Sequence, residues 1–432
     1  MMEKDLIVIG GGPSGLAAAI TAKENGIEDI IIIEKMNVLS GNSKFAMNFY
    51  DMPNSKAMKE NGVDISKEEF INTLINKGAW ETSERLEAWA DSAWSLDKWL
   101  RRMGAELNYH FGGEQSTNHL SEKNEYAGKH IQKAFENRIK ELEIETQMET
   151  SVTDLLYRED RVVGVQVSDY ENTYNIFAKA VIITAGGFSA NKDLLAEYVP
   201  GAEILETTNQ EGAEGDFIYI ARQYNFMLEH MEALKIPPAK LKDEHYLTGS
   251  GDGYILVNEN SERFMDETTM GIPRAKIIQK QPNGNAYYII DEERKEAQPN
   301  RRKHAELGYY VVGENLKDLA EKLQLDGAKL EKEILMFNEA VEKGSGDPYR
   351  EKPSQFKLDP TGPIYATLIE PAVHMTNGGI VANEHAQVLT NNNKVVPGLY
   401  AAGEVTNQSR GFSQSVTFGR IAGDEATKFI SS

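Results

Sequence analysis

A glycine-rich turn near the start of the chain constrains the fold more than any other feature. The apolar run 6–9 leads into three glycines at G-x-G-x-x-G spacing, Gly10, Gly12 and Gly15. Helix-forming residues continue to Gly26, and a second apolar run, 30–33, ends at Glu34. Strand, tight turn, helix and strand in this order are typical of a parallel sheet, so the sequence predicts a Rossmann-like α/β fold.

The same turn predicts a site for a pyrophosphate-bridged dinucleotide. Glycines permit the tight turn and the close approach of backbone to pyrophosphate, and the helix amino end offers unpaired N–H groups to the anion. Glu34, 19 residues after Gly15, is placed to accept hydrogen bonds from ribose hydroxyls. The motif alone does not separate FAD from NAD, and a glycine-rich turn in some other α/β protein is the alternative.

Composition and charge narrow the class of partner. The chain has 67 acidic and 46 basic residues, and a formal charge of -21 repels phosphate backbones, so we expect no nucleic-acid partner. No apolar run reaches the roughly 18 residues of a membrane span, and the first residues lack the apolar core of a signal peptide, so we expect a cytoplasmic protein. The chain has no cysteine and no histidines at metal-ligand spacing. We therefore expect no metal, and any redox chemistry must use an organic cofactor.

Later segments resemble the flavin motifs of the fumarate reductase/succinate dehydrogenase flavoprotein family. The first is Ser40-Gly41-Asn42-Ser43 with Ala46, which is similar to the family's flavin-contacting segment. The others follow in the family's order, at 150–156 with 161–165, 180–188, 212–216, 371–379, 397–405 and 418–423. Glu214 and Phe217 depart from the A-T-G-D-G signature. The chain is identified as a member of this family, as a soluble flavocytochrome-c-like flavoprotein domain without haem.

The resemblance implies noncovalent FAD in an α/β enzyme, a Rossmann-like FAD-binding domain with an inserted α+β capping domain. The FAD-binding domain is expected at 1–236, with a helical insertion at about 51–125, and at 365–432, and the capping domain at 237–364. Carried over residue by residue, the resemblance assigns to FAD binding Gly10, Gly12, Pro13, Ser14, Gly15, Glu34, Lys35, Gly41, Asn42, Ser43, Ala46, Val152, Ala185, Gly186, Gly187, Asp216, His374, Gly403, Glu404, Gln414 and Ser415.

Three residues are candidates for catalysis. Flavin enzymes of this family transfer a hydride between flavin N5 and a carbon next to a carbonyl or carboxylate, while a side chain moves the accompanying proton. Arginine and histidine bind substrate carboxylates, so the candidates are Arg274, His374 and Arg410. The alternatives are a solvated surface charge for Arg274, a satisfied core histidine for His374 and a salt bridge for Arg410.

The chain departs from fumarate reductases at their substrate residues. The family's proton-donor arginine falls on Met270, and the glutamate and arginine of its proton relay fall on Leu247 and Ser250. The paired histidines are reduced to one in His374-Met375. The resemblance therefore does not extend to fumarate as the substrate.

We accordingly expect an FAD-dependent oxidoreductase that transfers a hydride between flavin N5 and a polarised C=C or CH–CH bond of a small molecule, with a separate electron donor or acceptor. A ketosteroid-dehydrogenase-like enzyme acting on apolar enones is the alternative in this class, favoured by Met270 and Met375. An electron-transfer flavoprotein subunit without a carbon substrate is an alternative of another class. Substrate, direction of reaction and oligomeric state stay open.

Residues 66–100 are predicted to be helical, with a capping box formed by Ser66 and Glu69. All four tryptophans lie between Trp80 and Trp99. Because aromatic side chains dominate protein cores, packing inside these helices is favoured over a stacking platform for substrate.

Overall fold

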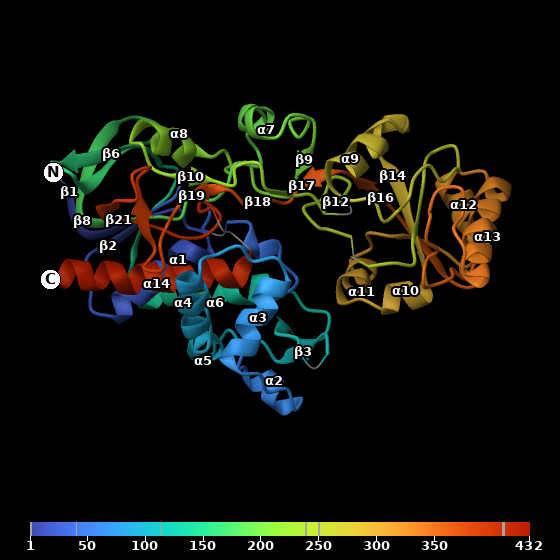
Figure 1. Ribbon diagram of the computed structural model, residues 1–432, viewed down its shortest axis with the longest axis horizontal. Helices are drawn as coiled ribbons and strands as arrows, with labels where there is room; N and C mark the ends of the chain where they lie inside the picture. Colours follow the sequence, from blue (N-terminus) through green and yellow to red (C-terminus); the bar gives the residue numbers. More distant parts are fainter. Residues whose placement is uncertain (1, 40, 114, 238–239, 249–250, 408–410) are drawn as a thin grey trace. The chain divides into compact units, whose positions relative to one another are not determined.

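The chain forms two compact units (Figure 1). The computed structural model describes residues 2–39, 41–113, 115–237, 240–248, 251–407 and 411–432. Unit 1 comprises Met1–Glu203, Asn209–Leu234 and Met375–Ser432. Unit 2 comprises Ile204–Thr208 and Lys235–His374.

A mostly parallel sheet forms the centre of unit 1. Its strand order is β20-β21-β8-β1-β2-β5, and β7 joins β6 to the edge of β8. β1 pairs in parallel with β2 and β8, which places Leu6 opposite Ile30 and Ala180. The bounds of these strands are β1 (Met2–Ile9), β2 (Ile30–Ile33), β5 (Glu145–Gln147), β6 (Ser151–Arg158), β7 (Arg161–Ser168), β8 (Thr173–Ile183), β20 (Gln387–Leu389) and β21 (Val395–Ala401). The predicted Rossmann-like α/β fold is thereby confirmed.

Both faces of this sheet are covered, which explains the unbroken apolar runs of its strands. Leu6 and Val8 pack on the side of α1 (Pro13–Glu24), α6 (Ala127–Glu141) and α14 (Phe412–Ser431), which lie together along one face (Figure 1). Ile7 and Ile9 pack on the other side, with α8 (Asp216–Gln223). The amino-terminal and carboxy-terminal segments of the chain therefore share one core.

Gly419 and Gly423 allow α14 to lie directly against α1. A Cβ on Gly419 would stand 2.2 Å from the carbonyl oxygen of Ser14, and one on Gly423 would stand 2.3 Å from that of Ala18. Only residues without a side chain fit at such distances.

The region predicted to be helical at 66–100 forms three helices. These are α3 (Lys67–Asn76), α4 (Ser83–Ala93) and α5 (Leu96–Arg102). Ser66 and Glu69 form the predicted capping box. The first helix ends because Gly78 adopts φ +83°, a left-handed conformation that stops a helix. The remaining elements of unit 1 are η1 (Ser43–Phe45), α2 (Lys56–Glu60), β3 (Tyr109–Phe111), β4 (Asn118–Leu120), α7 (Lys192–Tyr198), β10 (Leu228–Glu229), β18 (Met375–Thr376) and β19 (Gly379–Ile380).

Unit 2 is an antiparallel sheet with helices. Its strand order is β12-β16-β14-β13, and β15 also pairs with β16. Alternate residues along these strands face two separate hydrophobic cores. Ile255 and Ile289 face the core that contains Leu319 and Phe337, whereas Tyr288 faces the core that contains Met265. The bounds are β9 (Glu206–Thr207), β12 (Lys240–Leu241), β13 (Ile255–Val257), α9 (Gly271–Gln279), η2 (Pro282–Gly284), β14 (Ala286–Asp291), α10 (Glu292–Glu296), α11 (Pro299–Glu306), β15 (Val311–Gly313), α12 (Leu316–Leu323), α13 (Gly327–Lys343), β16 (Ile364–Glu370) and β17 (Ala372–Val373).

Unit 2 extends beyond the limits 237–364 that the sequence indicated for the capping domain. β16 pairs along its whole length with β14, from Ile364 opposite Asp291 to Ile369 opposite Ala286. β17 then pairs with β9, which brings 204–208 into the same unit. These pairings join residues far apart in sequence, so the apolar pattern of β16 gave no sign of which sheet it enters.

The helices in the described part of the chain include none that is both long and apolar enough to cross a membrane.

Candidate cofactor-binding site

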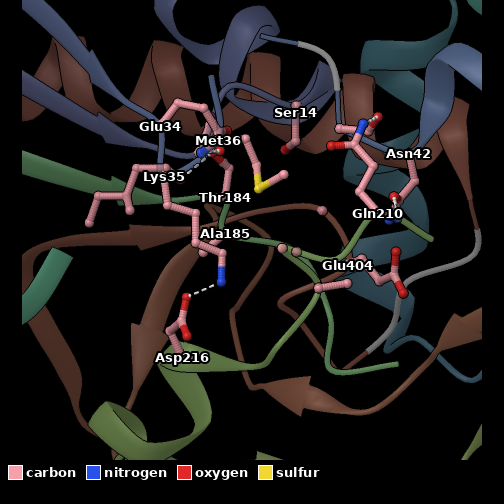
Figure 2. Close-up of a pocket in the computed structure, with 18 of the residues that line it drawn as sticks. Ser14, Glu34, Lys35, Met36, Asn42, Thr184, Ala185, Gln210, Asp216 and Glu404 are labelled. Carbon is pink, nitrogen blue, oxygen red and sulfur yellow. Dashed lines mark hydrogen bonds and ion pairs between the residues drawn. The ribbon is translucent and has the colours of Figure 1, made fainter. Parts of the chain in front are cut away.

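A pocket lies in unit 1 at the carboxyl ends of β1, β2 and β8 (Figure 2). Its empty space, including solvent at the mouth, is about 930 Å³. Gly10 ends the first strand, Glu34 the second and Thr184 the third, and Gly403 and Ser415 close the wall from the other end of the chain. Ligands of open α/β sheets bind at this edge.

The glycines of the turn differ in what they permit. Gly10 adopts φ +101°, which turns the chain out of β1. A Cβ on Gly15 would stand 2.0 Å from the carbonyl oxygen of Gly10, so Gly15 permits the contact between helix and strand. Gly12 has φ -76° and open space around it, because a Cβ there would come no closer than 3.7 Å to Gly41. Close approach of a ligand is therefore the reason left for Gly12.

The amino end of α1 fits an anion. The helix has no side-chain cap and no acidic residue in its first turn. The Ser14 hydroxyl lines the pocket, is buried and has no hydrogen-bond partner. A buried hydroxyl without a partner is costly unless a ligand supplies one. Unpaired N–H groups at a helix start and this hydroxyl together suit a pyrophosphate.

Glu34 is fixed at the end of β2. Its Oε2 accepts a hydrogen bond from the backbone N–H of Gly11 at 2.7 Å, and its Oε1 accepts one from Met36 at 2.8 Å. The carboxylate is thereby held at the pocket wall, as expected for the acid that binds a ribose.

Lys35 forms ion pairs with two acidic residues at one end of the pocket. Its Nζ lies 2.7 Å from Asp216 Oδ2, as Figure 2 shows, and 2.8 Å from Glu214 Oε2. Burial opposes the ammonium charge, yet the hydrogen bonds from Asp216 and Glu214 raise the pKa of Lys35 above its ordinary value. The lysine therefore keeps its charge and ties the start of α8 to the end of β2.

Glu404 lies toward the other side of the pocket from Asp216 (Figure 2). Its Oε1 accepts hydrogen bonds from the backbone N–H of Thr376 at 3.1 Å and from the Thr376 hydroxyl at 3.4 Å. Burial raises the pKa of Glu404 to about 7, against the lowering effect of the Thr376 bonds. A carboxyl group in this state can donate or accept a hydrogen bond near neutral pH.

Most of the residues assigned to FAD from the sequence line this pocket. The exceptions among the described residues are Gly15, Ala46, Gly187, His374 and Gln414. Gly15 and Gly187 act through close packing, since a Cβ on Gly187 would stand 2.0 Å from Thr376 Oγ1. The side chain of Gln414 donates to Glu81 Oε1 at 2.7 Å.

The structure adds lining residues that the sequence did not reveal. Gln210 donates its backbone N–H to Asn42 Oδ1 at 2.8 Å and its side-chain amide to the Gly41 carbonyl. Thr184 donates its hydroxyl to the Ile9 carbonyl at 2.7 Å, which joins the ends of β8 and β1. Phe217, noted only as a departure from the family signature, also lines the pocket. A single glutamine in a loop carries no pattern by which to find it, whereas Thr184 lies within the motif at 180–188 although it was not singled out.

Neither of the two catalytic candidates within the described residues, Arg274 and His374, lines this pocket. His374 belongs to unit 2, where its Nδ1 lies 2.8 Å from Thr208 Oγ1. Burial, and then the charge of Lys235, lowers the pKa of His374 to about 3, so its ring is neutral. Arg274 is 1% exposed within unit 2. Arg410 lies outside the described residues.

Comparison with known proteins supports one family. The family model described as "FAD binding domain" matches residues 5–416. Fumarate reductase (cytochrome) of Shewanella frigidimarina is 30% identical over 98% of this chain and 77% of its own length. Urocanate reductase of Eggerthella lenta is 28% identical over 98% of this chain and 74% of its own length.

Solved structures show the same fold. The open conformation of a flavocytochrome c3 fumarate reductase superimposes with a TM-score of 0.87 and 27% identity, over all of this chain and 79% of its own. A 3-ketosteroid Δ4-(5α)-dehydrogenase of Rhodococcus jostii RHA1, at 20% identity and a TM-score of 0.66, covers 99% of this chain and 97% of its own and shares the fold. With the nucleotide fingerprint, the pocket and the family match together, the chain belongs to the fumarate reductase/succinate dehydrogenase flavoprotein family and is an FAD-dependent oxidoreductase acting on CH–CH groups.

Proposed function

We propose that this enzyme reduces the polarised C=C bond of a small molecule other than fumarate. The observation that carries the proposal is Met270, which stands where the family resemblance places the proton-donor arginine and is 53% exposed. A dicarboxylate needs paired cations, and a thioether offers none. Bound FAD supplies the electron pair, while the residues of the chain hold it, bind the alkene and exclude water.

Arg274 stays a proposed substrate residue. Its Nη1 donates to the Tyr254 hydroxyl at 3.1 Å and to the carbonyl oxygen of Glu267 at 2.8 Å, so one side of the guanidinium is anchored. Its Nε and Nη2 are buried without a hydrogen-bond partner. This is the edge that binds a carboxylate side-on, which suits a substrate with one carboxylate. Because Arg274 is buried, the preceding segment must move for a substrate to reach it.

We further propose that FAD is held noncovalently. Covalent flavin links use histidine, cysteine or tyrosine side chains, and the described residues that line the pocket include none of these types. Acid precipitation of the yellow holoenzyme tests this, because it should release all of the flavin into the supernatant. Flavin that stays with the pellet would contradict noncovalent binding.

Electrons are proposed to come from a separate donor, since a cysteine-free chain holds neither a Cys-ligated cluster nor a Cys-attached haem. The expected cytoplasmic location also stays a prediction, which cell fractionation tests.

Single-turnover mixing tests the function. The flavin of the holoenzyme is photoreduced without oxygen and mixed with a panel of acrylate, cinnamate, fumarate and cyclohexenone. Rapid reoxidation by at least one alkene, with fumarate slow, is the expected result. Reoxidation by dyes and oxygen alone would instead favour an electron-transfer subunit, and a preference for cyclohexenone over all three acids would favour the ketosteroid-dehydrogenase-like alternative.

The variant Met270→Arg tests the position itself. Restoring an arginine should raise the rate with fumarate by about tenfold or more, because an anion-binding donor is returned to a site that lacks one. Met270→Leu is the matched control and should leave the rate with fumarate unchanged. Equal rates for both variants would show that this position does not contact substrate.

A further inference from the structure

Trp80 differs from the other tryptophans in its surroundings. Trp89 is fully buried and Trp99 is 4% exposed, as expected for packing in helices, whereas Trp80 is 39% exposed. It lies in the connection between α3 and α4, outside any helix or strand. An indole that is 39% exposed on a connecting segment contributes less apolar burial to the core than the indoles of Trp89 and Trp99.

Two hydrogen bonds fix this connection against the carboxy-terminal flavin motif. The indole Nε1 of Trp80 donates to the carbonyl oxygen of Asn407 at 3.1 Å. The next residue, Glu81, accepts a hydrogen bond from Gln414 Nε2 at 2.7 Å. The ring of Trp80 is therefore held in a set orientation although much of it is exposed.

His230 packs on the ring of Trp80. The two ring centroids are 5.0 Å apart, at an interplanar angle of 41°. Asn407 Nδ2 donates to Glu229 Oε2 at 3.0 Å, so Asn407 holds both the tryptophan and the segment that carries the histidine. His230 has φ +56°, a conformation that is uncommon for a residue with a side chain. Such backbone strain is retained where the surrounding contacts demand it.

Residues that contact Trp80 and His230 lie only a few positions in sequence from residues at one end of the FAD pocket. Asn407 is three residues after Glu404, which lines the pocket. A Cβ on Gly378, two residues after the Glu404 partner Thr376, would stand 2.2 Å from the carbonyl oxygen of His230. Glu34, expected to bind the adenosine ribose, lies at the other end of the pocket (Figure 2). The flavin of a bound FAD would then lie at the Glu404 end of the pocket, and Asn407 and Gly378 link Trp80 and His230 to that end along the chain.

We propose that Trp80 and His230 form a platform that binds a planar aromatic group attached to the C=C bond of the substrate. This rests on the proposed function and deepens it, since it names the substrate class as aryl-substituted unsaturated acids. A ring conjugated with an alkene lies flat with it, and a fixed indole binds flat rings through offset stacking at little entropic cost. The departures at Met270 and Met375 remove charged side chains, so stacking would add to the affinity that Arg274 supplies through the substrate carboxylate.

The test uses the holoenzyme with cinnamate and acrylate as probes, which differ by one phenyl ring. Trp80→Leu should raise KM for cinnamate by about 5- to 10-fold, the range of one aromatic contact, and leave KM for acrylate within about twofold. Trp80→Phe should keep most of the affinity for cinnamate that Trp80→Leu loses. Trp94→Leu, at a partly exposed tryptophan after α4, is the matched control and should change neither value. Equal effects of Trp80→Leu on both probes would overturn the platform.

Binding is also read without turnover, from the change in the visible spectrum of the oxidised flavin on titration with cinnamate. We expect the wild-type spectrum to change saturably with cinnamate. The platform is supported if the dissociation constant from this titration rises at least fivefold in Trp80→Leu while the flavin content stays unchanged. No perturbation in the wild type, or the same titration in both proteins, overturns it. If no alkene reoxidises the reduced flavin, the proposed function is wrong. Failure of the platform and failure of the proposed function can therefore be distinguished.

Discussion

The carbonyl oxygen of Gly10 occupies the space that a side chain on Gly15 would need, because a Cβ there would stand 2.0 Å away. Gly12 has no such neighbour, since its nearest approach would be 3.7 Å. One motif thus contains one glycine that packing requires and one that packing does not require.

This difference predicts opposite results for two alanine variants. Gly15→Ala should lower the free energy of unfolding by about 3 kcal/mol or more, because backbone cannot yield to a clash of that size. Gly12→Ala should stay within about 1 kcal/mol of the wild type but bind FAD at least about tenfold more weakly. Chemical denaturation and FAD titration measure the two effects. Gly327→Ala, with its Cβ in ordinary contact at 3.5 Å, is the control that should change neither.

Lys35 is expected to retain the adenosine end of the cofactor. Lys35→Met removes both ion pairs with Glu214 and Asp216 and should speed FAD release by about two- to fivefold at low salt. The difference from the wild type should shrink as salt rises, because ions screen the pair. Stopped-flow fluorescence of released FAD measures the rate. Lys59→Met, at an exposed lysine, is the control, and a salt-independent difference would contradict the ionic explanation.

Glu404 predicts a pH dependence in the FAD-free protein. Burial raises the pKa of its carboxyl from 4.5 to about 7, so the folded state holds this proton more tightly than the unfolded state. The resulting stabilisation is complete below pH 4.5 and is lost as the pH rises toward 7. Glu404→Gln should remove this loss, so the variant should gain stability relative to the wild type between pH 5 and pH 8. Parallel thermal melts that show a constant difference across this range would refute the assignment.

A buried ion cluster is expected to stabilise unit 2. Arg263 donates from Nε and Nη2 to the two oxygens of Glu267 at 2.9 Å and from Nη1 to Asp347 at 2.7 Å, and all three side chains are at most 3% exposed. Arg263→Met should lower the free energy of unfolding by about 3–5 kcal/mol, because it leaves buried carboxylates without their partner. Adding Glu267→Gln should recover part of this loss. Calorimetry of the holoenzyme measures both, and a loss below about 1 kcal/mol would contradict the prediction.

The sequence predicted the parts of the site that depend on local pattern. Glycine spacing, the apolar strands and Glu34 are read within about thirty residues, and the structure places them as expected. Gln210 could not be found, because it reaches the site through a contact with the distant residue Asn42. Trp80 was grouped with helix-packing tryptophans because sequence shows neither where a helix ends nor which segments flank the connection.

The cofactor site is assembled from segments made at opposite ends of synthesis. Ser14 meets Gly403 and Gly419, which leave the ribosome long after it. While translation proceeds, β1 and α1 lack the helix α14 that covers them, so the nascent protein exposes apolar surface that chaperones recognise. The FAD site is therefore complete only after α14 has been made, because Ser415 lines the pocket and Gly419 lies directly against Ser14.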